Sequence, residues 1–177
     1  MIDTFIETYN GGTFDYLFPE DSKITIEDIA RGLSKVCRFG GQIASFYSVA
    51  QHCTIMSYQV EPQFALEALL HDASEAFMCD VPKPLKTMLP DYCVIEKRVE
   101  KFLCKKFGVP FPMSKEIKVA DLRMLATEKE WLLPNSNLCW KILDGVLPYG
   151  IVIDPEEHSL AMEKFINRYN ELTLVAN

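Results

Sequence analysis

The segment from Glu61 to Asp80 constrains the fold of this chain more than any other. Between Phe64 and Phe77 the side chains are apolar on nearly every side of a helix, which predicts a central and buried helix. The segment contains no lysine or arginine but has several ionisable side chains, among them Glu67, His71, Asp72 and Glu75. Burying a carboxylate without a cation is costly, so these acids must be protonated, exposed, or neutralised from elsewhere.

A bound metal ion is the simplest source of that positive charge. His71 and Glu75 are four residues apart and Asp72 and Glu75 three apart, so on a helix they share one sector. His52 and Asp121, on two other predicted helices, would complete a ligand set with His71 and Asp72, as facing helices of a bundle commonly do. Imidazoles mixed with carboxylates favour one divalent ion among Mn²⁺, Fe²⁺, Co²⁺, Ni²⁺ and Zn²⁺, whereas Mg²⁺ prefers oxygen ligands.

The proposed ligands also have simpler interpretations. His52 alone would be a hydrogen-bonded histidine on a half-buried helix. Asp121 has cations nearby for an ion pair, although its apolar neighbours at helical spacing turn it inward; these neighbours are Ile117, Met124 and Leu125. Glu128 lies on the same inward face, and we expect it to pair with a lysine or with Arg38. Considered together with His71 and Asp72, His52 and Asp121 are better explained as metal ligands.

The remaining pattern predicts an all-α, single-domain bundle of about six helices. Apolar spacing and capping signals place these helices at 25–37, from Ser48 onward, 64–77, 91–107, from Ser114 onward and 154–172. Short alternating segments around Asn10-Gly11-Gly12 predict a small N-terminal β-hairpin. We expect an N-terminal extension over 1–24, a helical core over 25–133, and a C-terminal part over 134–177 that is loop-like before its last helix.

Charge and composition narrow the class of protein. With 25 acidic and 18 basic side chains the net charge is −7, which argues against a surface that binds duplex nucleic acid. No apolar run approaches the roughly 20 residues that span a bilayer, and the N-terminus lacks the basic start of a signal peptide, so we expect a cytoplasmic protein without membrane contact. The six cysteines form no Cys-x-x-Cys pair, and we expect reduced, mostly buried thiols.

The order of His52, then His71-Asp72, then Asp121 resembles the HD-domain metal-dependent phosphohydrolases. The similarity extends along the run Leu69-Leu70-His71-Asp72-Ala73-Ser74-Glu75-Ala76-Phe77 and continues through Asp80, Pro82, Pro84 and Lys86. This longer pattern is similar to the branch that contains bacterial 5′-deoxynucleotidases, and related phage proteins include a dATP triphosphohydrolase. The resemblance covers roughly Ile26 to Leu133.

The resemblance implies a role for each matching residue. His52, His71, Asp72 and Asp121 would coordinate one metal ion, and Glu75, with Asp72, would serve catalysis by orienting water or passing a proton to the leaving oxygen. Substrate contacts would come from Arg38 and Lys86 to phosphate, from Asp80 to a sugar hydroxyl, and from Phe39 to the base or sugar. In the 5′-deoxynucleotidases the aromatic residue after the arginine is tryptophan.

We therefore expect an enzyme that hydrolyses a deoxynucleotide, as either a mono- or a triphosphate. Two alternatives stay open at this point: a nucleotide-sensing or scaffold protein without turnover, and a cyclic-nucleotide phosphodiesterase. The apolar stretch from Pro148 to Ile153 favours self-association into a dimer or a larger homo-oligomer.

Overall fold

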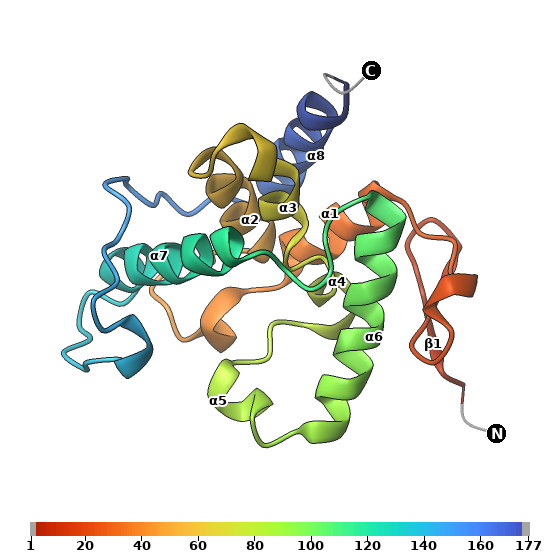
Figure 1. Ribbon diagram of the computed structural model, residues 1–177, viewed down its shortest axis with the longest axis horizontal. Helices are drawn as coiled ribbons and strands as arrows, with labels where there is room; N and C mark the ends of the chain where they lie inside the picture. The colour runs from red at the N-terminus through yellow and green to blue at the C-terminus, as the bar shows by residue number, and fades with distance from the viewer. Residues whose placement is uncertain (1–2, 175–177) are drawn as a thin grey trace.

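The computed structural model describes residues 3–174 and confirms an all-α fold with one N-terminal hairpin (Figure 1). Strand β1 (Phe5–Glu7) pairs antiparallel with β2 (Thr13–Asp15), with Ile6 opposite Phe14. The turn between them contains Gly11 in the left-handed region, as the Asn-Gly-Gly signal predicted. The ring of Phe14 is fully buried and anchors the hairpin to the helical part.

Short polar caps begin most of the long helices. Thr25 and Asp28 form a reciprocal capping box at the start of α1 (Ile26–Lys35), and Ser114 caps α7 (Lys115–Leu132). At the start of α2 (Val49–Tyr58), Ser48 accepts the N–H of Gln51, but the second half of the predicted box is missing. The Gln51 side chain instead binds the backbone of Asp154 and Glu156, and so ties α2 to the segment before α8 (His158–Leu174).

The predicted helix over 64–77 is two helices, α3 (Ala65–Leu70) and α4 (Glu75–Met78), preceded by a 3₁₀ turn η3 (Pro62–Phe64). Between them the backbone hydrogen bonds join residues three positions apart, as in a 3₁₀ turn, from Ala73 N to Leu70 O and from Glu75 N to Asp72 O. The carbonyl of Ala68 accepts from the imidazole of His71 at 2.8 Å, in place of the amide that a regular helix would offer. The prediction of one continuous helix was therefore wrong, although its central position is correct.

The other elements follow the prolines and glycines. The loop predicted after Asp80 contains a short helix, α5 (Lys83–Lys86), and α6 (Pro90–Phe107) ends at Gly108 with a left-handed φ of 71°. Residues 134–153 are loop-like as predicted, with one 3₁₀ turn, η4 (Lys141–Leu143), and further 3₁₀ turns occur at η1 (Pro19–Asp21) and η2 (Arg38–Gly41). The last helix begins at His158, later than the predicted Asp154.

Two clusters of apolar side chains form the core, and α2 and α3 contribute to both. The first cluster gathers the hairpin, α1, α4, α6 and α8 around Val49, Leu69 and Phe165. The second gathers α7 and the C-terminal loop around Met56, Ala68 and Met124. In Figure 1, α8 lies across the group of α1, α2 and α3, while α7 extends away from α6. The seam between the clusters is where α2 and α3 meet α7.

The expectation about the cysteine side chains needs correction. All six cysteines are free thiols, but only Cys53 is buried, while Cys79 and Cys139 are exposed. The expectation of mostly buried thiols was therefore wrong, because most of these positions lie at helix ends or in loops.

No helix within residues 3–174 combines the length and the apolar character needed to cross a membrane.

Close packing of α1 against α4 makes Gly32 sensitive to substitution. A Cβ at this position would lie 2.5 Å from the carbonyl oxygen of Ala76. We expect Gly32→Ala to destabilise the protein by about 1–3 kcal/mol, and thermal denaturation should show the midpoint falling by roughly 2–4 °C per kcal/mol. Gly150→Ala is the matched control, since nothing lies within 4 Å of its added Cβ. Equal midpoints for the two variants would contradict this account.

Candidate metal centre

Three nitrogen and oxygen donors meet at the seam of the core, from α2 and from the turn between α3 and α4. The Nε2 atoms of His52 and His71 are 3.2 Å apart, and Oδ2 of Asp72 lies 3.2 Å from Nε2 of His71 and 3.7 Å from Nε2 of His52. Metal–ligand bonds of about 2.0–2.2 Å place neighbouring donors about 2.8–3.6 Å apart. The group formed by His52, His71 and Asp72, called the histidine cluster or simply the cluster from here on, can therefore hold a metal ion.

Asp121 approaches the same point from α7. Its Oδ1 is 3.6 Å from Nε2 of His52 and 3.9 Å from Nε2 of His71, and its side chain is 41% exposed. The carboxylate thus faces the two imidazoles and not only open water, in keeping with the apolar residues around it on α7. All four residues singled out in the sequence as ligands lie together, with Asp121 at the open side.

The hydrogen bonds behind the two imidazoles decide which ring nitrogens carry protons. Nδ1 of His71 lies 2.8 Å from the carbonyl oxygen of Ala68, and Nδ1 of His52 lies 2.5 Å from Oε1 of Glu128. A carbonyl and a carboxylate only accept, so each Nδ1 carries the proton and each neutral ring turns the lone pair of Nε2 toward the other. Two lone pairs at 3.2 Å, with carboxylate oxygens beside them, are stabilised by positive charge between them, which a proton or a metal ion can supply.

The charges around the cluster favour positive charge at its centre. Burial disfavours the charged form of His71, but its neighbours, Asp72 foremost, outweigh burial and raise the pKa of His71 well above its usual value. Burial would also raise the pKa of Asp72, yet His71, His52 and Arg38 lower it overall. Cys53 stays protonated, because burial raises the pKa of its thiol to about 11.

Arg38 and Glu128 form a buried ion pair beside the cluster, which is one of the two pairings predicted for Glu128. The carboxylate of Glu128 accepts from Nε and Nη2 of Arg38 at 3.2 and 3.0 Å. Burial would raise the pKa of Glu128, but Arg38 and His52 lower it, so the acid is ionised. Nη1 of Arg38 lies 3.5 Å from Asp72. Arg38 therefore already has two carboxylate partners, and its contact with a phosphate stays a prediction.

Glu75, at the start of α4, has the properties of a buried acid. Its side chain is buried, and its Oε2 atom has no hydrogen-bond partner. Burial, followed by the charges of Asp72 and Asp80, raises the pKa of Glu75 well above its usual value. Burial also raises the pKa of Asp80, on which the charges of Arg38, Asp72 and His52 act. Glu75 and Asp80 thus lie within the electrostatic reach of the cluster.

The remaining predicted substrate contacts lie at the rim. Phe39 is half-buried, with its ring 5.6 Å from the Arg38 guanidinium and 6.4 Å from the ring of Trp140. Lys86 binds the buried carboxylate of Glu96 at 2.6 Å. Sequence reasoning missed Glu96 as the partner of this lysine, because Glu96 is one of several charged residues on α6 and nothing in the sequence distinguishes it.

Backbone strain occurs beside the same residues. Within residues 3–174, Phe39 and Cys79 are the non-glycine residues with positive φ, at 57° and 64°. Phe39 directly follows Arg38, and Cys79 directly precedes Asp80. Strained backbone of this kind concentrates at functional sites. The phenolic hydroxyl of Tyr16 donates to the carbonyl of Phe77 at 2.6 Å and helps to hold this end of α4.

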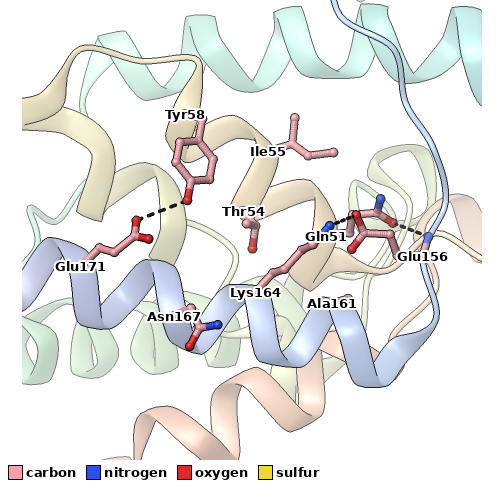
Figure 2. A pocket seen from close by; sticks show the side chains of 9 residues that line it. All are labelled: Gln51, Thr54, Ile55, Tyr58, Glu156, Ala161, Lys164, Asn167 and Glu171. Atoms are coloured by element: carbon pink, nitrogen blue, oxygen red, sulfur yellow. Dashed lines mark hydrogen bonds and ion pairs between the residues drawn. The ribbon is translucent and has the colours of Figure 1, made fainter.

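A hollow of about 380 Å³ lies elsewhere, between α2 and α8 (Figure 2). Its ionic groups already pair with one another: Lys164 binds Glu156, and the hydroxyl of Tyr58 donates to Glu171. His52 does not line this hollow, although Gln51 and Thr54 of the same helix do. The chemistry is therefore concentrated at the histidine cluster and not in the hollow.

Metal binding should stabilise the protein more at high pH than at low pH. Because the pKa of His71 is raised by folding, its proton contributes stability that is complete below the usual value of 6.5 and is lost as pH rises through the raised pKa. A metal ion competes with that proton. We expect the rise in melting temperature caused by Co²⁺ to grow between about pH 6 and about pH 8.5. Asp72→Asn should abolish the rise, and a rise independent of pH would contradict this site.

Comparison with known proteins adds relatives but no described activity. No family model matches the chain. It is 40% identical over 173 residues to the uncharacterized protein YfdR of Escherichia coli K12, covering 96% of each chain. It is 35% identical over 139 residues to an uncharacterized protein of Rhodobacter capsulatus, covering 68% of this chain and 69% of the other. With this identity over nearly the whole length of both chains, the protein belongs to the same family as YfdR.

Proposed function

We propose that the protein is a metal-dependent phosphohydrolase of nucleotides, with deoxynucleotides as the first class to test. The observation that carries the proposal is the convergence of two imidazole lone pairs with the carboxylates of Asp72 and Asp121. The resemblance of the His52, His71-Asp72 and Asp121 order to HD-domain phosphohydrolases supports the same conclusion. The four residues would hold one divalent ion, with Mn²⁺, Fe²⁺, Co²⁺, Ni²⁺ or Zn²⁺ preferred over Mg²⁺.

When bound, the ion lowers the pKa of water and neutralises charge on the phosphoryl group. The raised pKa of Glu75 favours its protonated form, which is suited to donate a proton to the leaving oxygen. Asp72 keeps its charge and helps to orient the cluster, since its pKa is lowered. These roles divide acid catalysis and charge stabilisation between two residues three positions apart.

The rim residues suit the rest of a nucleotide. Asp80 would accept a hydrogen bond from a sugar hydroxyl, and the half-buried ring of Phe39 would contact the sugar or base. Lys86 would reach the phosphate by exchanging its bond to Glu96 for a phosphate oxygen. Arg38 would act chiefly through Asp72, from which its Nη1 atom is 3.5 Å away.

A product assay distinguishes the reactions that this site would support. The protein, loaded with Mn²⁺ or Co²⁺, is incubated with each deoxynucleoside mono- and triphosphate and with cyclic nucleotides, and the products are separated. Nucleoside plus phosphate identifies a 5′-nucleotidase, nucleoside plus triphosphate a triphosphohydrolase, and a linear monophosphate a phosphodiesterase. Nucleotide binding without any product would contradict the enzymatic proposal and favour a sensing or scaffold protein.

Glu75→Gln should separate catalysis from metal binding. We expect the rate constant kcat to fall by roughly 10²–10⁴-fold, because the amide cannot transfer the proton. The metal content, measured by elemental analysis, should stay at the wild-type level. The wild-type rate should decline as pH rises through the raised pKa of Glu75, and the variant should lack this decline.

The matched control for this variant is Glu67→Gln, because Glu67 is also buried, but its carboxylate oxygen accepts the backbone N–H of Ser114 at 2.6 Å. This control should retain activity. A Glu75→Gln protein with wild-type kcat would remove Glu75 from the mechanism.

A further inference from the structure

Glu128 contacts both sides of the cluster from a fully buried position on α7. One oxygen, Oε1, lies 2.5 Å from Nδ1 of His52, and the other, Oε2, accepts from two nitrogens of Arg38. Arg38 in turn reaches Oδ2 of Asp72 with Nη1 at 3.5 Å. A single carboxylate is thus connected to the imidazole from α2 and, through one guanidinium, to the carboxylate from the α3–α4 turn.

We propose that Glu128 is a positioning residue for two metal ligands at once: it orients His52 directly and Asp72 through Arg38. This inference rests on the proposed metal site and adds a role that the ligand pattern alone does not assign. The contact of Glu128 with His52, called the direct arm here, fixes the tautomer of His52, because Nδ1 must donate to the carboxylate and Nε2 is left to bind the ion. The contact of Glu128 with Arg38, called the indirect arm, sets the position of the guanidinium beside Asp72.

The indirect arm also prevents competition for Asp72. Arg38 is buried, and its closest counter-charge is Glu128, whose oxygen is 3.0 Å from Nη2, against 3.5 Å from Nη1 to Asp72. Without the charge of Glu128, the guanidinium would be drawn toward Asp72, which acts on Arg38 more strongly than the other remaining carboxylates, Asp121 and Asp80. A cation bound closely to Asp72 would occupy the oxygen that the metal needs. Glu128 therefore keeps the Arg38 guanidinium near Asp72 but prevents the guanidinium from taking the place of the metal ion on the Asp72 carboxylate.

Stability alone does not explain why this group is charged. A buried ion pair is often no more stabilising than apolar side chains of the same volume, because both charges lose their hydration. Glu128 is fully buried, and besides Arg38 and His52 the hydroxyl of Tyr47 also acts on its carboxylate. A charged residue at this position is explained by the two partners that it orients.

The test measures binding of Co²⁺ alone, by titration and by its visible absorption spectrum, in the full-length chain. We expect Glu128→Gln to bind Co²⁺ about 10–100-fold more weakly than wild type, with a changed spectrum, as for other residues that orient metal-bound histidines. Glu67→Gln is the matched control, since it removes another buried carboxylate, whose partner is the backbone N–H of Ser114. It should bind Co²⁺ with wild-type affinity and spectrum.

A double variant tests the arm through Arg38. If unbalanced Arg38 competes for Asp72, then Arg38→Met/Glu128→Gln should bind Co²⁺ more tightly than Glu128→Gln alone. Losses that simply add would overturn this arm. If Glu128→Gln fails to fold, the double variant still tests the contact between Glu128 and His52, because it has no unbalanced charge. Weaker Co²⁺ binding and a changed spectrum relative to wild type would support that contact. Wild-type affinity and spectrum would overturn it.

The outcomes separate this inference from the metal site itself. A wild-type protein that takes up no Co²⁺ overturns the site and the inference together. Wild-type binding that is retained in Glu128→Gln, or lost equally in Glu67→Gln, overturns the inference alone.

Discussion

The hydrogen bond between Nδ1 of His52 and Glu128 determines what the buried cluster can bind, because it leaves the lone pair of Nε2 facing that of His71. The matching bond from His71 to the carbonyl of Ala68 completes this arrangement. Without those two acceptors, either ring could turn its N–H inward, and the two rings would satisfy each other as donor and acceptor. With them, the two rings are poised to accept a positive charge, and Asp72 and Asp121 lie beside them.

The same bond to Ala68 also shapes the backbone. By occupying that carbonyl, His71 interrupts the regular hydrogen bonding of α3, and the chain passes through a tight turn before α4. His71 and Asp72 therefore extend from a turn held between two short helices, and not from the middle of one helix. The packing of Gly32 against Ala76 and the bond from Tyr16 to Phe77 then fix the position of α4, which starts at Glu75.

The sequence predicts the helical class, the hairpin and the approximate limits of α1, α6 and α7, because apolar spacing and capping residues are local signals. It also groups the residues of the cluster, since His71 and Asp72 stand in an apolar run without a cation and Asp121 stands on an apolar face. The break in the central helix was missed because it depends on one side chain competing with the backbone. The pairing of Lys86 with Glu96 depends on which helices meet in space, and helix periodicity does not specify this.

Backbone strain and buried acids near the cluster also indicate a functional site. Phe39 and Cys79 hold backbone conformations that cost about 1–3 kcal/mol each, and glycine would hold them more easily. Glu75 and Glu128 are buried acids with opposite pKa shifts: desolvation and neighbouring acids raise the pKa of Glu75, whereas Arg38 and His52 lower that of Glu128. A core selected for stability alone would contain neither feature. Their concentration around three donors that can hold a metal ion is the arrangement expected where a protein keeps reactive groups in place at the expense of stability.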